Sequence, residues 1–127
     1  MLLKKLRDQV LVHEYGLDGV RTFPWTGVNA PFGAAYCVVA PGTDTLDHVN
    51  SPADEDELFI VISGQGTVFL GDDAVPVVSG DQVFIPQGMR HFVRNESEQP
   101  FHFYTIWWNA EGVAEFQAKR AIATAAA

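Results

Sequence analysis

Turn-forming residues stand at fixed offsets in the second half of this chain, and they constrain the fold more than any other feature. The positions concerned are Gly80, Pro86, Gly88, His91 and Asn95. A Gly-Asp pair at 80–81 is typical of a turn between strands, and proline ends the β-favouring run 82–85. The segment 86–88 then reverses the chain, because proline fixes φ and glycine accepts conformations that a β-carbon resists. This spacing places His91 near the start of the next strand, where side-chain alternation can point it inward.

A second cluster lies earlier in the chain and is likewise bounded by glycines. Its members are Gly42, His48, Asn50, Glu57 and Gly64. Leu46, His48 and Asn50 share one face if that stretch is extended. The apolar run 58–62 after Glu57 predicts a strand buried on both faces. A carboxylate entering such a core needs a cation or strong hydrogen bonds, and a metal ion bound also by two imidazoles would meet that need.

The remaining patterns predict short strands and one terminal helix. Strands are expected at 34–40, 67–70, 74–78 and 101–108, with a hairpin turn at 71–73. Glycines and prolines in the first thirty residues favour edge strands and an arm over a helix. Asn109 can cap a helix with acidic residues early and basic residues late. Short strands with frequent turn signals predict an all-β barrel or sandwich.

The two clusters together resemble the two motifs of the cupin superfamily, whose fold is a double-stranded β-helix or jelly-roll barrel. The resemblance covers about residues 33–108 of a single domain that spans 1–127, and 109–127 would be a short C-terminal helix or a linker. It implies His48, Glu57 and His91 as metal ligands. Asn50 stands where the family usually has a further histidine, and the spacer from Asn50 to Glu57 is longer than usual.

This departure affects the expected metal chemistry. An amide oxygen is a poor ligand for zinc, copper or nickel, so we expect Asn50 to bind weakly or to hydrogen-bond a metal-held water. Two histidines and one carboxylate leave open coordination positions and suit one divalent transition metal, zinc first and Fe(II) or Mn(II) next. The alternative is a pocket that has lost its metal, with His48 and His91 as ordinary pocket histidines.

Two classes of function follow. In a metal-dependent enzyme, the ion acts as a Lewis acid or activates a reactant, and Asn50, Gln65 and His102 are candidate polar partners of the substrate. For His102, a packed or surface histidine is the favoured alternative. In a binding module, the pocket only captures a small effector. Aromatic side chains, including Trp25, predict a small-molecule ligand with an apolar or planar part.

A narrower resemblance concerns residues 23–33, the His48, Glu57 and His91 set, and the alanine-rich end. These features are similar to cupin domains that precede a methionyl-tRNA synthetase-like domain in hydrazine synthetases of natural-product pathways. That resemblance implies a zinc cupin that forms an N–N bond from an amino-acid ester of a hydroxylamine, and a fused or partner downstream domain. An Fe(II) or Mn(II) dioxygenase, an isomerase and an epimerase stay open as alternatives.

Charge and composition exclude some partners. The formal net charge is -8, which argues against nucleic acid and anionic membranes as partners. The single cysteine, Cys37, excludes an intrachain disulfide and reads as a small buried hydrophobe. Charges near the start of the chain argue against a signal peptide, so we expect a cytoplasmic protein. Resemblance to cupins also implies a homodimer.

Overall fold

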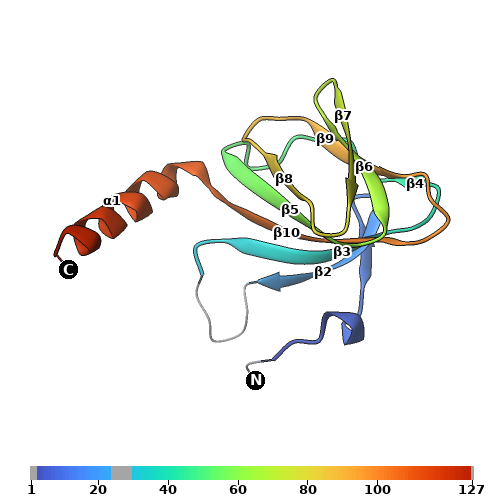
Figure 1. Ribbon diagram of the computed structural model, residues 1–127, viewed down its shortest axis with the longest axis horizontal. Helices are drawn as coiled ribbons and strands as arrows, with labels where there is room; N and C mark the ends of the chain where they lie inside the picture. Colours follow the sequence, from blue (N-terminus) through green and yellow to red (C-terminus); the bar gives the residue numbers. More distant parts are fainter. Residues whose placement is uncertain (1–2, 24–29, 127) are drawn as a thin grey trace.

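The computed structural model describes residues 3–23 and 30–126, and these residues form two antiparallel sheets that face each other, with a helix at the C-terminal end (Figure 1). The elements in chain order are a short 3-10 turn Leu6–Asp8, β1 Val12–Glu14, β2 Leu17–Phe23, β3 Gly33–Val39, β4 Thr43–Asp44, β5 Glu55–Ser63, β6 Gln65–Leu70, β7 Asp73–Val78, β8 Gln82–Ile85, β9 His91–Asn95, β10 Phe101–Asn109 and α1 Ala110–Ala126. The predicted all-β jelly roll with a C-terminal helix is therefore confirmed, and the first thirty residues hold edge strands and only one helical turn.

Strand order explains how the chain encloses an interior. The larger sheet has the order β1-β2-β3-β10-β5-β8, and the smaller sheet has the order β4-β9-β6-β7. Strand β10, the last in the sequence, lies between β3 and β5 in the larger sheet. After β3 the chain crosses from one sheet to the other at every connection except the β6–β7 hairpin, which is the connectivity expected of a jelly roll.

The core lies between the sheets and is built from alternate residues of each strand. Phe101 and Phe103 of β10 are 1% and 2% exposed, and they pack with Phe59 of the neighbouring strand β5 and with Val68 and Val93 of the facing sheet. Because side chains on a strand alternate between faces, the residues between them point to the outer surface.

This alternation corrects one prediction. The run 58–62 is not buried on both faces, because Phe59 and Val61 are 5% and 2% exposed whereas Ile62 is 41% exposed. Its outer face belongs to the outside of the larger sheet, and neighbouring Phe84 is also 51% exposed. The apolar run therefore marks an inner core face and an outer apolar surface on the same strand.

Glycines make the predicted turns where the chain reverses. Gly80 and Gly88 have φ values of 90° and 77°, so they adopt the left-handed conformation that favours glycine. Gly64, between β5 and β6, has a φ of 84°, and a β-carbon there would lie 2.5 Å from the Pro100 carbonyl oxygen. These turns fix where β8 ends and where β9 begins.

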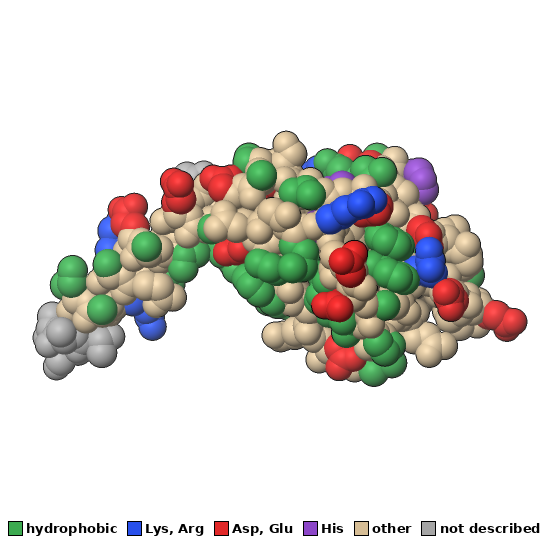
Figure 2. Space-filling model, turned by 90° about the horizontal axis from the view of Figure 1, so that it is seen from above, with side chains coloured by type: hydrophobic (Ala, Val, Ile, Leu, Met, Phe, Trp, Pro, Cys, Tyr) green, Lys and Arg blue, Asp and Glu red, His purple; other side chains and the backbone are tan. Residues whose placement is uncertain are grey.

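Helix α1 projects from the body of the molecule (Figures 1 and 2). Asn109 caps it as predicted, because its Oδ1 accepts a hydrogen bond from the Gly112 amide at 3.1 Å. Phe116 and Ile122 are 56% and 70% exposed on this helix. No helix among the described residues is both long and apolar enough to span a bilayer.

Candidate functional site

A cavity of about 400 Å³ lies inside the fold. Its wall includes His48, Asn50, Glu57, His91 and Thr105. These residues come from the loop after β4 and from strands β5, β9 and β10, so both sheets contribute. The polar side chains predicted from the sequence thus share one cavity with the Thr105 hydroxyl, which was not predicted.

Glu57 is the most strongly held of these groups. It is only 8% exposed, and its Oε1 accepts a hydrogen bond from Asn50 Nδ2 at 3.1 Å. Its Oε2 accepts a second one from the Thr105 hydroxyl. Burial alone would raise the pKa of this carboxyl, but the contacts with His91, Thr105 and Asn50 outweigh burial and lower the pKa. The protein contacts of Glu57 therefore favour the ionised form of this buried carboxylate.

His91 stands at the start of β9, as predicted, and is 2% exposed. Its Nδ1 lies 2.9 Å from the Met89 carbonyl oxygen, and its Nε2 lies 3.4 Å from Glu57 Oε1. Burial would lower the pKa of this imidazole, but the Glu57 carboxylate and the Met89 carbonyl raise it. Because a carbonyl can only accept, Nδ1 carries the proton, and Nε2 is the nitrogen left for the carboxylate or for a metal.

His48 lies beside His91 although its segment forms no long strand. The two residues make an isolated antiparallel bridge with amide-to-carbonyl distances of 3.2 Å and 3.0 Å, and their ring centroids are 4.7 Å apart. Nδ1 of His48 lies 2.9 Å from the Leu46 carbonyl oxygen. Both imidazoles thus use Nδ1 on a backbone carbonyl and leave Nε2 available.

The chemistry of these donors suits a divalent metal. Metal-binding histidines commonly donate the other ring N–H to a carbonyl or carboxylate, which fixes the tautomer, and both histidines here have that arrangement. Over residues 3–23 and 30–126, however, no group of three or more His, Cys, Asp or Glu side chains is already drawn together as an ion would hold it. Glu57 contacts His91 directly, and His48 contacts the His91 ring.

The structure separates the three residues predicted to act on the substrate. Asn50 lies in the cavity wall and donates to Glu57 itself. His102 does not line the cavity and is the packed histidine of the alternative: it lies on the outer face of β10 between Phe101 and Phe103, and its Nδ1 lies 2.5 Å from the Tyr36 hydroxyl. Gln65 is exposed at the first position of β6 and does not line the cavity either.

Sequence reasoning missed several polar residues of the cavity wall, among them Tyr15, Glu55 and Thr105. Thr105 gave no clear sequence signal, because residues 101–108 carry large side chains on both faces and alternation alone does not say which face is inward. Glu55, the first residue of β5, is half-buried, and burial, Glu57 and Asp54 raise the pKa of its carboxyl.

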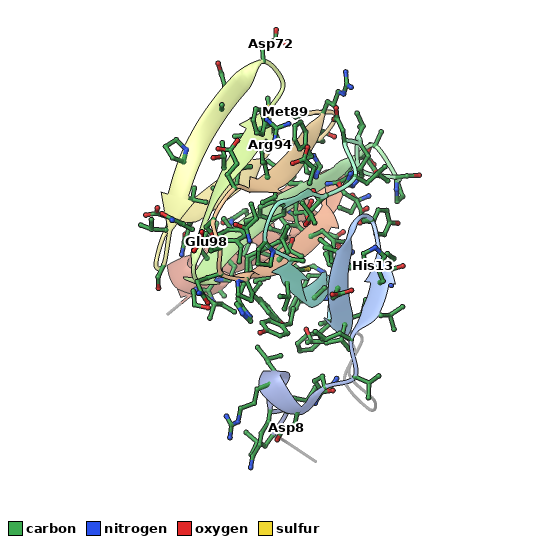
Figure 3. All side chains as sticks on the ribbon, turned by 90° about the vertical axis from the view of Figure 1, so that its right-hand side faces the viewer. Asp8, His13, Asp72, Met89, Arg94 and Glu98 are labelled. Atoms are coloured by element: carbon green, nitrogen blue, oxygen red, sulfur yellow. The ribbon has the colours of Figure 1, made fainter. Side chains whose placement is uncertain are left out.

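The aromatic and apolar wall follows the same alternation. Trp107 lines the cavity, whereas Trp108 lies on the other face of β10 and stacks near Phe84, with ring centroids 6.3 Å apart. Cys37 also lines the wall and is buried as predicted, and burial raises the pKa of its thiol to about 12. Trp25 lies outside the described residues. His13 lies on the outer side of the β1–β2 hairpin (Figure 3) and pairs with Asp18 at 2.8 Å, as expected of a surface residue.

Comparisons with known proteins agree with this architecture. The cupin domain family matches residues 35–107, more than half of the chain. The plu4264 protein from Photorhabdus luminescens is 41% identical over 95% of this chain and 98% of that chain, with a TM-score of 0.80. A Cupin 2 conserved barrel domain protein from Salinispora arenicola is 34% identical over 94% of this chain and 98% of that chain, with a TM-score of 0.78. The chain belongs to the cupin family.

A shorter match joins the chain to an uncharacterized protein from Aquifex aeolicus. The two are 41% identical over 46 residues, which are 36% of this chain and 38% of that protein. The match thus spans well under half of that relative.

Proposed function

We propose that this cupin is a metal-dependent enzyme that acts on a small molecule in its cavity. The observation that carries the proposal is the pairing of a buried, ionised Glu57 with His91 while both His91 and His48 donate Nδ1 to backbone carbonyls. Buried charges without a partner are costly, so a carboxylate and two oriented imidazoles at the wall of one cavity favour a cation-binding role.

In this proposal His48, Glu57 and His91 hold one divalent transition metal, and Zn, Fe(II) and Mn(II) all suit the donors. When bound, the metal would supply Lewis-acid activation of a substrate group or of water. Thr105 and Asn50 orient the Glu57 carboxylate through their hydrogen bonds. Phe59, Phe103 and Trp107 give the wall an apolar side that excludes water from the ligand.

Metal analysis of protein purified without added ions tests the proposal. We expect about one equivalent of a divalent metal per chain, lost in Glu57→Ala and in His91→Ala, with the β-sheet circular dichroism spectrum retained. His13→Ala is the matched control, because His13 is an exposed histidine outside the cavity. Metal retained in both cavity variants would contradict the ligand assignment.

A second candidate is a metal-free binding module, and one observation favours it. Both oxygens of Glu57 already accept hydrogen bonds from protein donors, and His91 adds a third polar contact without any ion. In this alternative, the Glu57–His91 pair recognises a polar group of a small effector. Protein that stays metal-free after incubation with Zn²⁺, Mn²⁺ and Fe²⁺ would favour this module over the enzyme.

The reaction itself stays a prediction. N–N bond formation from an amino-acid ester of a hydroxylamine has no support from the fold, the cavity or the relatives. Oxygen consumption with candidate substrates would separate a dioxygenase from Lewis-acid chemistry. A cytoplasmic location likewise stays a prediction.

We also propose a homodimer that pairs through the outer face of the larger sheet. Ile62 and Phe84 are 41% and 51% exposed on that face, and Trp108 lies beside Phe84. Light scattering should give twice the chain mass of 14.0 kDa, and Phe84→Glu should return the protein to a monomer. A wild-type monomer would contradict this assembly.

A further inference from the structure

The turn between β1 and β2 has an unusual residue for its geometry. Tyr15 and Gly16 are the two residues between the paired positions Glu14 and Leu17, and their φ values are 55° and 73°. Two-residue hairpin turns with positive φ at both central positions favour Asn-Gly, Asp-Gly or Gly-Gly. Tyr15 is the only non-glycine residue with positive φ in the described part of the chain. A bulky residue in this conformation carries a steric cost that asparagine or glycine would largely avoid.

Core packing does not explain Tyr15, because the residue is 48% exposed. Its ring instead lies against His48, with ring centroids 5.4 Å apart and an angle of 31° between the planes. Tyr15 also lines the cavity. Strained backbone conformations cluster at functional sites. Here the strained residue places an aromatic ring against His48, one of the proposed metal-binding residues.

Backbone contacts tie the same turn to His48 by a second route. The Leu46 amide donates to the Tyr15 carbonyl oxygen at 2.7 Å, and the Leu46 carbonyl is the acceptor for His48 Nδ1. Gly16 lies so close to the segment after β4 that a β-carbon there would be 2.9 Å from the Asp44 carbonyl oxygen. The β1–β2 turn therefore packs closely against the segment that carries His48.

We propose that Tyr15 is a positioning residue for His48. The Tyr15 ring packs against one face of the His48 imidazole. This contact keeps the Nδ1–H hydrogen bond to the Leu46 carbonyl, and the Nε2 lone pair is left for a metal ion or another group bound in the cavity. Without the ring, the imidazole can turn away from the carbonyl, and the preference for one tautomer is lost. The metal-binding part of this inference rests on the proposed function, but the orientation of His48 in the metal-free protein does not.

Two substitutions separate positioning from stability. Tyr15→Asn removes the ring and installs the favoured Asn-Gly turn, so we expect a thermal midpoint equal to or above that of the wild type. Tyr15→Phe keeps the ring and loses only the hydroxyl. Val12→Ala is the matched control, because it trims an exposed residue of β1, on the same hairpin, that does not line the cavity.

Two readouts test the inference. ¹⁵N NMR of the imidazoles in metal-free protein should show His48 as the Nδ1–H tautomer in the wild type, in Tyr15→Phe and in Val12→Ala, and as a mixture in Tyr15→Asn. Titration with Zn²⁺ should give a dissociation constant about tenfold weaker for Tyr15→Asn than for the other three proteins, the size typical of losing a group that orients a ligand.

The outcomes are distinguishable. An unchanged His48 tautomer in Tyr15→Asn would overturn the inference whether or not any metal binds. An unchanged Zn²⁺ affinity in a wild type that binds Zn²⁺ would overturn it while leaving the proposed function intact. A wild type that binds no Zn²⁺, Mn²⁺ or Fe²⁺, with a changed tautomer in Tyr15→Asn, would support the positioning role and contradict the metal enzyme.

Discussion

Nε2 of His91 lies 3.4 Å from Oε1 of Glu57, and the two residues are 2% and 8% exposed. In the absence of a metal each group favours the charged form of the other, since the pKa of Glu57 is lowered and that of His91 is raised. Removing one partner of such a pair leaves an uncompensated charge, so the pair and the groups around it govern both the stability and the chemistry of the cavity.

Loss of the Thr105 hydroxyl should destabilise the fold. Thr105→Val keeps the shape of the side chain but leaves Oε2 of Glu57 without its donor, which should lower the free energy of unfolding by about 1–3 kcal/mol. Urea denaturation of metal-free protein measures this. Thr105→Ser keeps the hydroxyl, so its free energy of unfolding should fall by less than that of Thr105→Val. An equal fall in the two variants would contradict the role of the hydrogen bond.

Asn50 should prove dispensable for binding a metal. Its amide donates to Glu57 at 3.1 Å, so it orients the carboxylate and is not one of the predicted ligands. Asn50→Ala should therefore keep about one equivalent of metal, with altered turnover once a substrate is known. Elemental analysis beside Glu57→Ala checks this, and loss of the ion in Asn50→Ala would make the amide a ligand.

Stability of the metal-free protein should depend on pH through the Glu57–His91 pair. Glu57 has a lowered pKa, so its contribution is present above its ordinary value of 4.5 and is lost as pH falls through the folded pKa. His91 has a raised pKa, so its contribution is present below its ordinary value of 6.5 and is lost as pH rises through the folded pKa. The pair should therefore stabilise the fold most between these two values.

Urea midpoints from pH 4 to pH 9, on the order of one pH unit apart to resolve these shifts, test this dependence. Because other groups also titrate, the informative quantity is the difference between the wild type and Glu57→Gln. That difference should be greatest in the weakly acidic window and should shrink on either side. A difference that grows steadily toward alkaline pH would contradict the ionised pair.

Gly33 should set the position of Trp107. A β-carbon at Gly33 would lie 2.3 Å from the indole nitrogen of Trp107, so Gly33→Ala forces that ring, which lines the cavity, to move. We expect overpacking to lower the free energy of unfolding by about 1–3 kcal/mol and to shift the tryptophan emission spectrum. Gly112→Ala is the control, since nothing lies within 4 Å of its added carbon. Equal stability of both variants would contradict the close contact.

Local sequence signals were sufficient to predict how the chain delivers His91. Turn residues with defined backbone preferences, Gly80 and Gly88, stand at the ends of β8 and before β9, and both adopt positive φ. The helix cap at Asn109 was predictable for the same reason, because capping depends on residues within one turn. Such features need no knowledge of distant contacts.

Whether His102 faces the cavity could not be decided from the sequence. Residues 101–108 carry large side chains on both faces, so period-two alternation cannot say which face is inward. Only the pairing of Phe103 with Cys37 and Val61 in neighbouring strands fixes the inward set, and His102 then falls outside. Tyr15 was missed because its contact with His48 depends on how a distant hairpin packs on the segment after β4.

The family match covers residues 35–107, whereas the ring that touches His48 belongs to residue 15. A minimal protein trimmed to the matched segment would keep every predicted ligand position and would lose one side of the support for His48. Transplanting His48, Glu57 and His91 into another barrel in this arrangement would therefore require the leading hairpin as well as the segments that carry these three residues.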